Sequence, residues 1–241
     1  DNGKECSSFA VLPALYAIRQ YADGNFDEEK ISRGFREIFG VSWEDFVSLE
    51  LPNATRGTLG GWIAENPCKS LLYNDCFLGI FDKAAEEEGE IPFGTYAGKL
   101  ADAASRAGDF AYLFDSLSSL CSLMEVKAGL GLRTRTAYRS GDRKAVAALL
   151  PEYDEALKRL ETFYARFKKL WFSENKPFGW EVQEARLGGL MLRIRSCGQR
   201  LRDYAEGKIP AVEELEEDIL PFGSQGLEYN FYRGIVSRSE L

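Results

Sequence analysis

The sequence contains no histidine among its 241 residues. Histidine is the usual general base of Ser-His-Asp and Cys-His systems and the commonest metal ligand in proteins. Its absence excludes those nucleophile systems, His-ligated metal sites and His-Glu-x-x-His proteases from this chain. Any chemistry carried by these residues would rest on carboxylates, Lys, Tyr or Cys.

Phosphate-binding motifs are also missing, and we therefore expect no cofactor and no metal. Gly129-x-Gly131 lacks the third glycine of a dinucleotide fingerprint, and no strand pattern precedes it. The chain has no Gly-Lys-Ser/Thr phosphate loop.

Long apolar runs are absent as well. No run approaches the roughly 20 residues that a membrane-spanning helix needs, and no signal-peptide pattern is present. We therefore expect no membrane partner. The odd number of cysteines and the lack of a Cys-x-x-Cys pair favour buried, reduced thiols in a cytoplasmic protein over disulfides or a thiolate metal site. These cysteines are Cys6, Cys68, Cys76, Cys121 and Cys197.

The charge balance is acidic, with 30 Lys and Arg against 38 Asp and Glu. The formal net charge of -8 disfavours nucleic acid as a partner. Basic residues nevertheless recur every seven positions in one predicted helix, and we expect them to pair with the acidic run at 213–218 or with an adjoining domain. The two rows contain Arg186, Arg193 and Arg200, and Arg195 and Arg202.

Apolar residues three and four positions apart predict a mainly α fold. Three stretches, at 96–128, 146–171 and 187–204, each place their apolar residues on one helical stripe. Such helices cover one another most simply as an antiparallel bundle. We divide the chain into shorter helices with an irregular connection at 1–94 and the long-helix bundle with a C-terminal segment at 95–241, together forming one compact unit.

Local signals support these boundaries. Ser42 resembles the start of a capping box, and Asp142 is a candidate N-cap of the second long helix. Pro151 could lie in the first turn of that helix or kink it. Gly188 and Gly189 lower helix propensity, which indicates a close crossing of another backbone.

No catalytic pair emerges from composition and spacing alone. Asp27-Glu28 fits a helix N-terminus, and Asp154-Glu155 fits a solvated helix face. Several aromatic residues could stack on sugar rings, although their apolar neighbours favour core positions. These aromatic residues are Trp62, Tyr73, Phe77, Phe81, Trp171, Phe172 and Trp180.

Three segments together resemble one family. Residues 1–7, Asp-Asn-Gly-Lys-Glu-Cys-Ser, resemble the end of the Trp-Gly-Asp-Asn-Gly-x-Glu-Cys-Ser motif that closes the catalytic barrel of some bacterial family 20 glycoside hydrolases, the β-N-acetylhexosaminidases. Residues 66–80 and 176–190 resemble the helical C-terminal domain of the same subgroup.

The resemblance implies that this chain is the non-catalytic C-terminal domain of a retaining exo-β-N-acetylhexosaminidase. Its partners would be an upstream barrel in the same polypeptide, the glycan that the barrel binds, and a second copy if the enzyme is a homodimer. In this family the substrate acetamido oxygen attacks the anomeric carbon, and an adjacent Asp-Glu pair in the barrel assists. Asp1 matches the acidic position that contacts hydroxyls of the terminal sugar.

Two other functions stay open at this point. One is an independent helical interaction module that uses the Arg rows or an apolar groove. The other is a sugar-binding module that uses exposed aromatic side chains. A domain of a larger enzyme should expose an apolar patch where the catalytic domain packs.

Overall fold

The computed structural model describes residues 7, 9–54, 67–220 and 237, and in these ranges the chain is mainly helical. The predicted fold class is confirmed. An isolated antiparallel bridge joins Gly79 to Ser237. The helices are α1 (Leu12–Ala22), α2 (Glu28–Phe39), α3 (Trp43–Val47), α4 (Pro67–Tyr73), α5 (Asp82–Glu88), α6 (Phe93–Ala104), α7 (Ala111–Lys127), α8 (Leu130–Arg139), α9 (Arg143–Glu174), α10 (Trp180–Ala205) and α11 (Glu213–Glu216).

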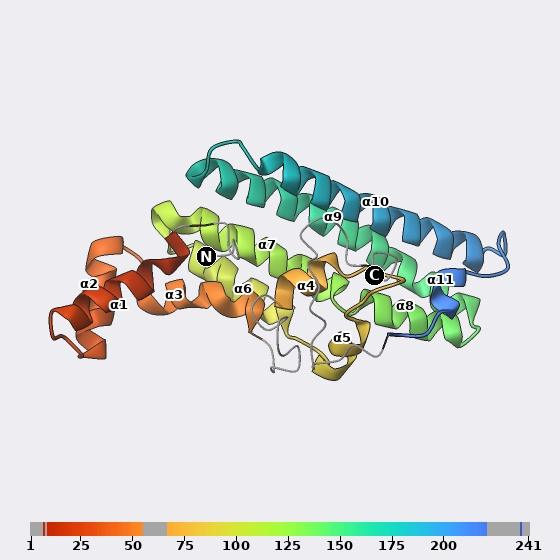
Figure 1. The fold of residues 1–241 in the computed structure, drawn as a ribbon, viewed down its shortest axis with the longest axis horizontal. Helices are drawn as coiled ribbons and strands as arrows, with labels where there is room; N and C mark the ends of the chain where they lie inside the picture. Colours follow the sequence, from red (N-terminus) through yellow and green to blue (C-terminus); the bar gives the residue numbers. More distant parts are fainter. Residues whose placement is uncertain (1–6, 8, 55–66, 221–236, 238–241) are drawn as a thin grey trace.

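Three long helices, α7, α9 and α10, run side by side along the length of the molecule, with α9 antiparallel to the other two (Figure 1). Their facing stripes are buried, as at Phe114, Leu160 and Ile194. Buried residues before and after residue 94 belong to the same core. Within the described ranges, no helix is both long and apolar enough to cross a membrane.

Helix α9 follows its sequence pattern closely. The Asp142 carboxylate accepts a hydrogen bond from the Lys144 backbone N–H at 2.8 Å, which confirms it as the N-cap. Pro151 lies inside the helix rather than in its first turn. Its ring cannot donate to the Ala147 carbonyl, but both residues are exposed, so water can satisfy that carbonyl.

The first predicted long helix is wrong in one respect: it is two helices. Helix α6 ends at Ala104, and α7 begins at Ala111 and returns alongside it. The turn between them contains Gly108 at a φ of 50°, a left-handed conformation that ends a helix at little cost for glycine. The apolar spacing persists through the turn because Ala107 is itself buried in the core.

The predicted close crossing at Gly188 and Gly189 is also wrong. Among the described residues, a Cβ atom added at either position would meet nothing within 4 Å. The close approach in α10 is instead at Gly198, where an added Cβ would lie 3.3 Å from the Cβ of Tyr153 on α9. Propensity indicates that a helical glycine is costly, but only packing tells which glycine faces a neighbour.

The shorter helices α1, α2 and α3 form a layer at one end of the bundle (Figure 1). Helix α2 is capped by Asp27, whose carboxylate accepts from the Lys30 N–H at 3.1 Å. The predicted cap of α3 is confirmed, since Ser42 Oγ accepts from the Asp45 N–H at 3.0 Å. Phe35 joins this layer to the core.

These glycines give a test of the α9–α10 packing. We expect Gly198→Val to lower the free energy of unfolding by about 1–3 kcal/mol, because its side chain must overlap Tyr153. Gly189→Ala should raise it by up to about 1 kcal/mol, since alanine favours the helix and open space surrounds the site. Urea unfolding followed by circular dichroism measures both. Similar effects of the two substitutions would contradict the packing described.

Candidate functional site

Asp1, which the resemblance assigns to substrate contact, lies outside the described residues. The structure therefore does not place it relative to any other group. The strongest polar constellation among the described residues lies elsewhere, inside the helical core.

That constellation is built on the connection between α4 and α5 together with the first residue of α5, and residues 74–82 are hereafter called the core segment. It contains the buried polar residues Asn74 and Asp75, and the buried Asp82 begins α5 at its end. Three helices packed around it contribute one cation each: Lys127 from α7, Arg135 from α8 and Arg193 from α10. Buried polar groups need partners, and the core segment and these cations supply one another's.

Asp75 forms a closer ion pair than Asp82 does. Its carboxylate accepts two hydrogen bonds from Arg193, at 2.7 and 3.0 Å. It also accepts from the backbone N–H groups of Phe77 and Leu78, at 2.7 and 3.1 Å. Burial raises the pKa of Asp75, but Arg193 and the two N–H donors outweigh it, so the pKa falls below its ordinary value.

Asp82 has weaker support and an opposite shift. It accepts a 2.8 Å hydrogen bond from Asn74 Nδ2, and its nearest cation, Arg135, is 4.0 Å away. Arg135 instead donates to the Phe77 carbonyl at 2.5 Å. Burial therefore prevails and raises the pKa of Asp82 to about 6, against the lowering by Asn74 and Arg135.

Lys127 is a buried lysine, a feature that can mark a catalytic amine. Its Nζ donates to the carbonyls of Leu71, at 2.8 Å, and Asn74. Burial lowers its pKa, although the nearby Cys76 and the acidic groups of the core segment act against that shift. Because the ammonium is buried and holds two backbone carbonyls, we interpret it as a structural donor.

The thiols are unsuited to nucleophilic chemistry. Burial raises the pKa of Cys76 to about 11 and that of Cys121 to about 12, and it raises the pKa of Cys68 and Cys197 further from the ordinary range. They remain protonated at neutral pH, whereas the thiolate is the reactive form. The prediction of buried, free thiols is confirmed for these four, and Cys6 lies outside the described residues.

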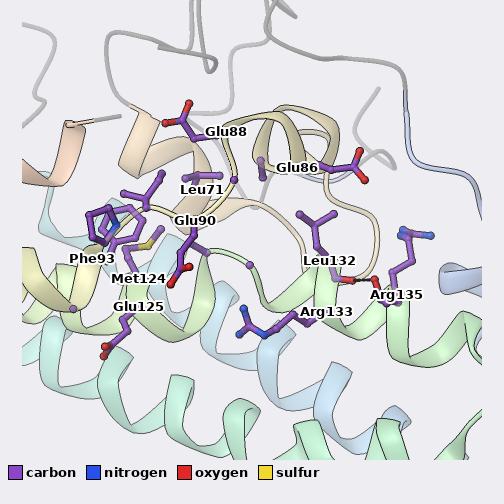
Figure 2. A pocket seen from close by; sticks show the side chains of 18 of the residues that line it. Leu71, Glu86, Glu88, Glu90, Phe93, Met124, Glu125, Leu132, Arg133 and Arg135 are labelled. Carbon is purple, nitrogen blue, oxygen red and sulfur yellow. Dashed lines mark hydrogen bonds between the residues drawn. The ribbon is translucent and has the colours of Figure 1, made fainter. Parts of the chain in front are cut away.

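A cleft of about 800 Å³ lies between the α5–α6 connection and the junction of α7 with α8 (Figure 2). Apolar side chains and charged side chains both line it. The apolar ones include Leu71, Ile91, Phe93, Met124 and Leu132, and the charged ones are Glu86, Glu88, Glu90, Glu125, Arg133 and Arg135.

Several charged side chains of the cleft are held by partners within the domain. Arg133 donates to Glu152 at 2.5 Å and to the Val126 carbonyl at 2.8 Å. Glu125 accepts from Arg159 at 2.6 Å. Among the described residues, no group of three or more Cys, Asp or Glu side chains could hold a metal ion. The cleft is therefore a recess to which the geometry assigns no reaction.

The Arg rows of α10 are largely taken up within the domain. Arg200 pairs with Glu213 at 2.7 Å and with Glu214 at 3.1 Å, so the predicted pairing with the acidic run is confirmed there. Arg193 holds Asp75, and the Arg186 guanidinium lies 3.9 Å from the ring centroid of Tyr73. These contacts take up the row of Arg186, Arg193 and Arg200. In the second row, Arg202 lies 3.8 Å from Asp154 and Arg195 is exposed.

The aromatic side chains proposed for sugar stacking are mostly in the core. Tyr73, Phe77, Phe81 and Trp180 are buried, as their apolar neighbours predict. Phe172 is about half exposed, and Trp62 lies outside the described residues.

Sequence reasoning missed the core segment as a polar site. One signal was available: Lys127 lies between the apolar residues Met124 and Leu130, a position at which an exposed lysine is not expected. The acidic partner Asp75 lies 118 residues from Arg193 in the sequence, and no local pattern connects the two.

Comparison with known proteins adds one finding. The family model described as the Glycoside Hydrolase 20C C-terminal domain matches residues 44–231, which is more than half of the chain. The match contains the core segment, the cleft and the long helices. No curated protein matches the chain.

Two Arg–Asp pairs with similar geometry provide a test of the core segment. Asp75→Asn should lower the free energy of unfolding by about 3–5 kcal/mol, because it leaves Arg193 without its counter-charge in the core. Asp45 makes the same two-bond contact with Arg106 near the surface, at 2.7 and 3.2 Å. Asp45→Asn should cost less than about 1 kcal/mol. Urea unfolding at pH 7 measures both.

The effect of Asp75→Asn should also depend on pH. The folded pKa of Asp75 lies below the unfolded value of 3.8, so its stabilisation is complete above that value. The stabilisation is lost as the pH falls through the folded pKa. The difference in the free energy of unfolding between Asp75→Asn and the unsubstituted protein should therefore shrink over this range. A difference that stays constant down to pH 3 would contradict this assignment.

Proposed function

The chain belongs to the family of glycoside hydrolase 20C C-terminal domains, and on that premise we propose that it is the non-catalytic helical domain of a retaining exo-β-N-acetylhexosaminidase. The whole enzyme removes terminal N-acetylglucosamine or N-acetylgalactosamine. The domain supports the catalytic barrel or the assembly of the enzyme, and the reaction takes place in the barrel.

The proposed chemistry belongs to the upstream barrel of the same polypeptide. The acetamido oxygen of the substrate attacks the anomeric carbon and takes the place of an enzyme nucleophile. An adjacent Asp-Glu pair in the barrel orients the acetamido group and protonates the leaving oxygen. Asp1 contributes a carboxylate, which can accept hydrogen bonds from two hydroxyls of the terminal sugar.

The family match over residues 44–231 is the observation that carries this proposal. The polar groups of the described core support it. Lys127 and Arg193, which could otherwise suggest acid–base or anion chemistry, satisfy backbone carbonyls and a buried carboxylate. Such groups stabilise a fold and leave the chemistry to another domain. We also propose a cytoplasmic location, for which the buried free thiols are the support.

The first test is activity. The polypeptide encoded by the reading frame that includes this sequence should hydrolyse an aryl N-acetyl-β-glucosaminide, and the 241-residue chain alone should not. Replacing the Glu of the upstream Asp-Glu pair with Gln should abolish turnover without loss of folding. A folded longer polypeptide without hydrolysis, or hydrolysis by this chain alone, would overturn the proposal.

The second test concerns Asp1. In the longer polypeptide, Asp1→Ala should lower kcat/KM by roughly 10²- to 10⁴-fold, because each of two hydrogen bonds to a charged group contributes about 1.5–3 kcal/mol. Asp23→Ala is the control, since Asp23 pairs only with the exposed Arg19 among the described residues. Steady-state kinetics on the aryl glycoside measures both. Equal kcat/KM values for the two variants would remove Asp1 from the site.

A further inference from the structure

Helix α1 presents an exposed apolar stripe, and at its C-terminal end the Tyr21 ring stacks on Phe26 with centroids 5.4 Å apart. Ile18 is 63% exposed and Leu15 is 57% exposed, although both are large aliphatic side chains. The helix carries a single charged residue, Arg19. We call the stripe the α1 face; it consists of Val11, Ala14, Leu15, Ile18, Tyr21 and Ala22, all of which are exposed.

The α1 face is continuous, because its residues recur three and four positions apart. The opposite side of α1 already has a partner: the Tyr16 ring contacts the Phe35 and Phe39 rings of α2, with centroids 5.7 and 6.1 Å apart. Helix α1 therefore carries apolar residues on two sides, and α2 covers the side that contains Tyr16. A contiguous exposed stripe of this kind marks an interface, unlike single exposed apolar side chains.

The position of α1 in the chain indicates what covers it. The family match begins at residue 44, so α1 and α2 precede the matched domain and lie between it and any upstream catalytic domain. The entry to α1 is fixed to the bundle, since Ser7 Oγ donates to Glu174 at the end of α9 at 2.9 Å. The family motif that residues 1–7 resemble closes the catalytic barrel, and the six-residue step from Asp1 to Ser7 spans at most about 20 Å.

We propose that the α1 face packs on the outer surface of the upstream catalytic barrel, as the helix that follows its last strand. In a barrel of alternating strands and helices, each strand is followed by a helix that covers it from outside, and this helix needs an apolar inner face. The α1 face has that character, and α2 and α3 then join the helix to the C-terminal core (Figure 1). This inference rests on the proposed function and adds the surface through which the two domains join.

Thiol labelling of the longer polypeptide tests the interface. Ile18→Cys places a thiol in the α1 face, and Leu192→Cys places one on α10 at a position that is also 63% exposed. A maleimide should label the thiol at position 192 at least tenfold faster than the thiol at position 18. The unsubstituted polypeptide gives the background, and circular dichroism with a cooperative unfolding transition shows that each variant is folded. Leu15→Cys should be protected like Ile18→Cys if the latter fails to fold.

The outcomes separate this inference from the proposed function. Fast labelling at position 18 in an active longer polypeptide would overturn the α1 interface and leave the hydrolase assignment intact. Slow labelling in a folded but inactive polypeptide would support the interface and contradict the assignment. Protection that disappears on dilution, together with a change from dimer to monomer in light scattering, would show that a second copy covers the face and would overturn the proposal.

Discussion

A non-helical segment runs through the centre of this helical domain, and the remaining packing is arranged around it. Residues 74–81 belong to no helix and no extended strand, and the bridge from Gly79 to Ser237 is isolated. A buried backbone without hydrogen bonds is costly. Side chains supply the missing donors: Lys127 binds the Leu71 and Asn74 carbonyls, and Arg135 binds the Phe77 carbonyl. The requirement for these donors explains why Lys127 and Arg135 occur at interior positions of α7 and α8, and the buried Asp75 carboxylate explains Arg193 in α10.

This arrangement also fixes how the helices lie relative to one another. The cations come from α7, α8 and α10, so one short segment connects three helices that are separated in the sequence. Buried ion pairs are weak evidence for high stability, because removing charges from water offsets much of their attraction. Their geometry is nevertheless specific: the two-bond contact of Arg193 with Asp75 is satisfied in one register of α10. We infer that the core segment selects the helix arrangement, while apolar burial supplies most of the free energy.

The sequence predicts the parts of the fold that depend on local spacing. The stripe of α9 and its Asp142 cap are local, and both are confirmed. Prediction fails where a local pattern has two three-dimensional solutions: the spacing from 96 to 128 fits one helix, yet Gly108 turns the chain and keeps Ala107 buried. Glycines 188 and 189 look special in sequence, whereas Gly198 is the one that packs against Tyr153. The polar site could not be derived, because Asp75 and Arg193 meet only in the folded chain.

The paired core and the exposed apolar stripe of α1 have one explanation under the proposed function. Within the matched region, the charged groups of the core segment are paired and the long helices cover one another. Ahead of it, α1 exposes a full stripe while its other side is held by α2. Such a helix would be unfavourable in a domain that folded and acted alone, since exposed apolar surface favours aggregation.

If α1 belongs to the catalytic barrel, the junction between the two domains falls near α3, where the family match begins, rather than in the irregular connection before α6. The helical core then supports the barrel through the layer that α1 and α2 form.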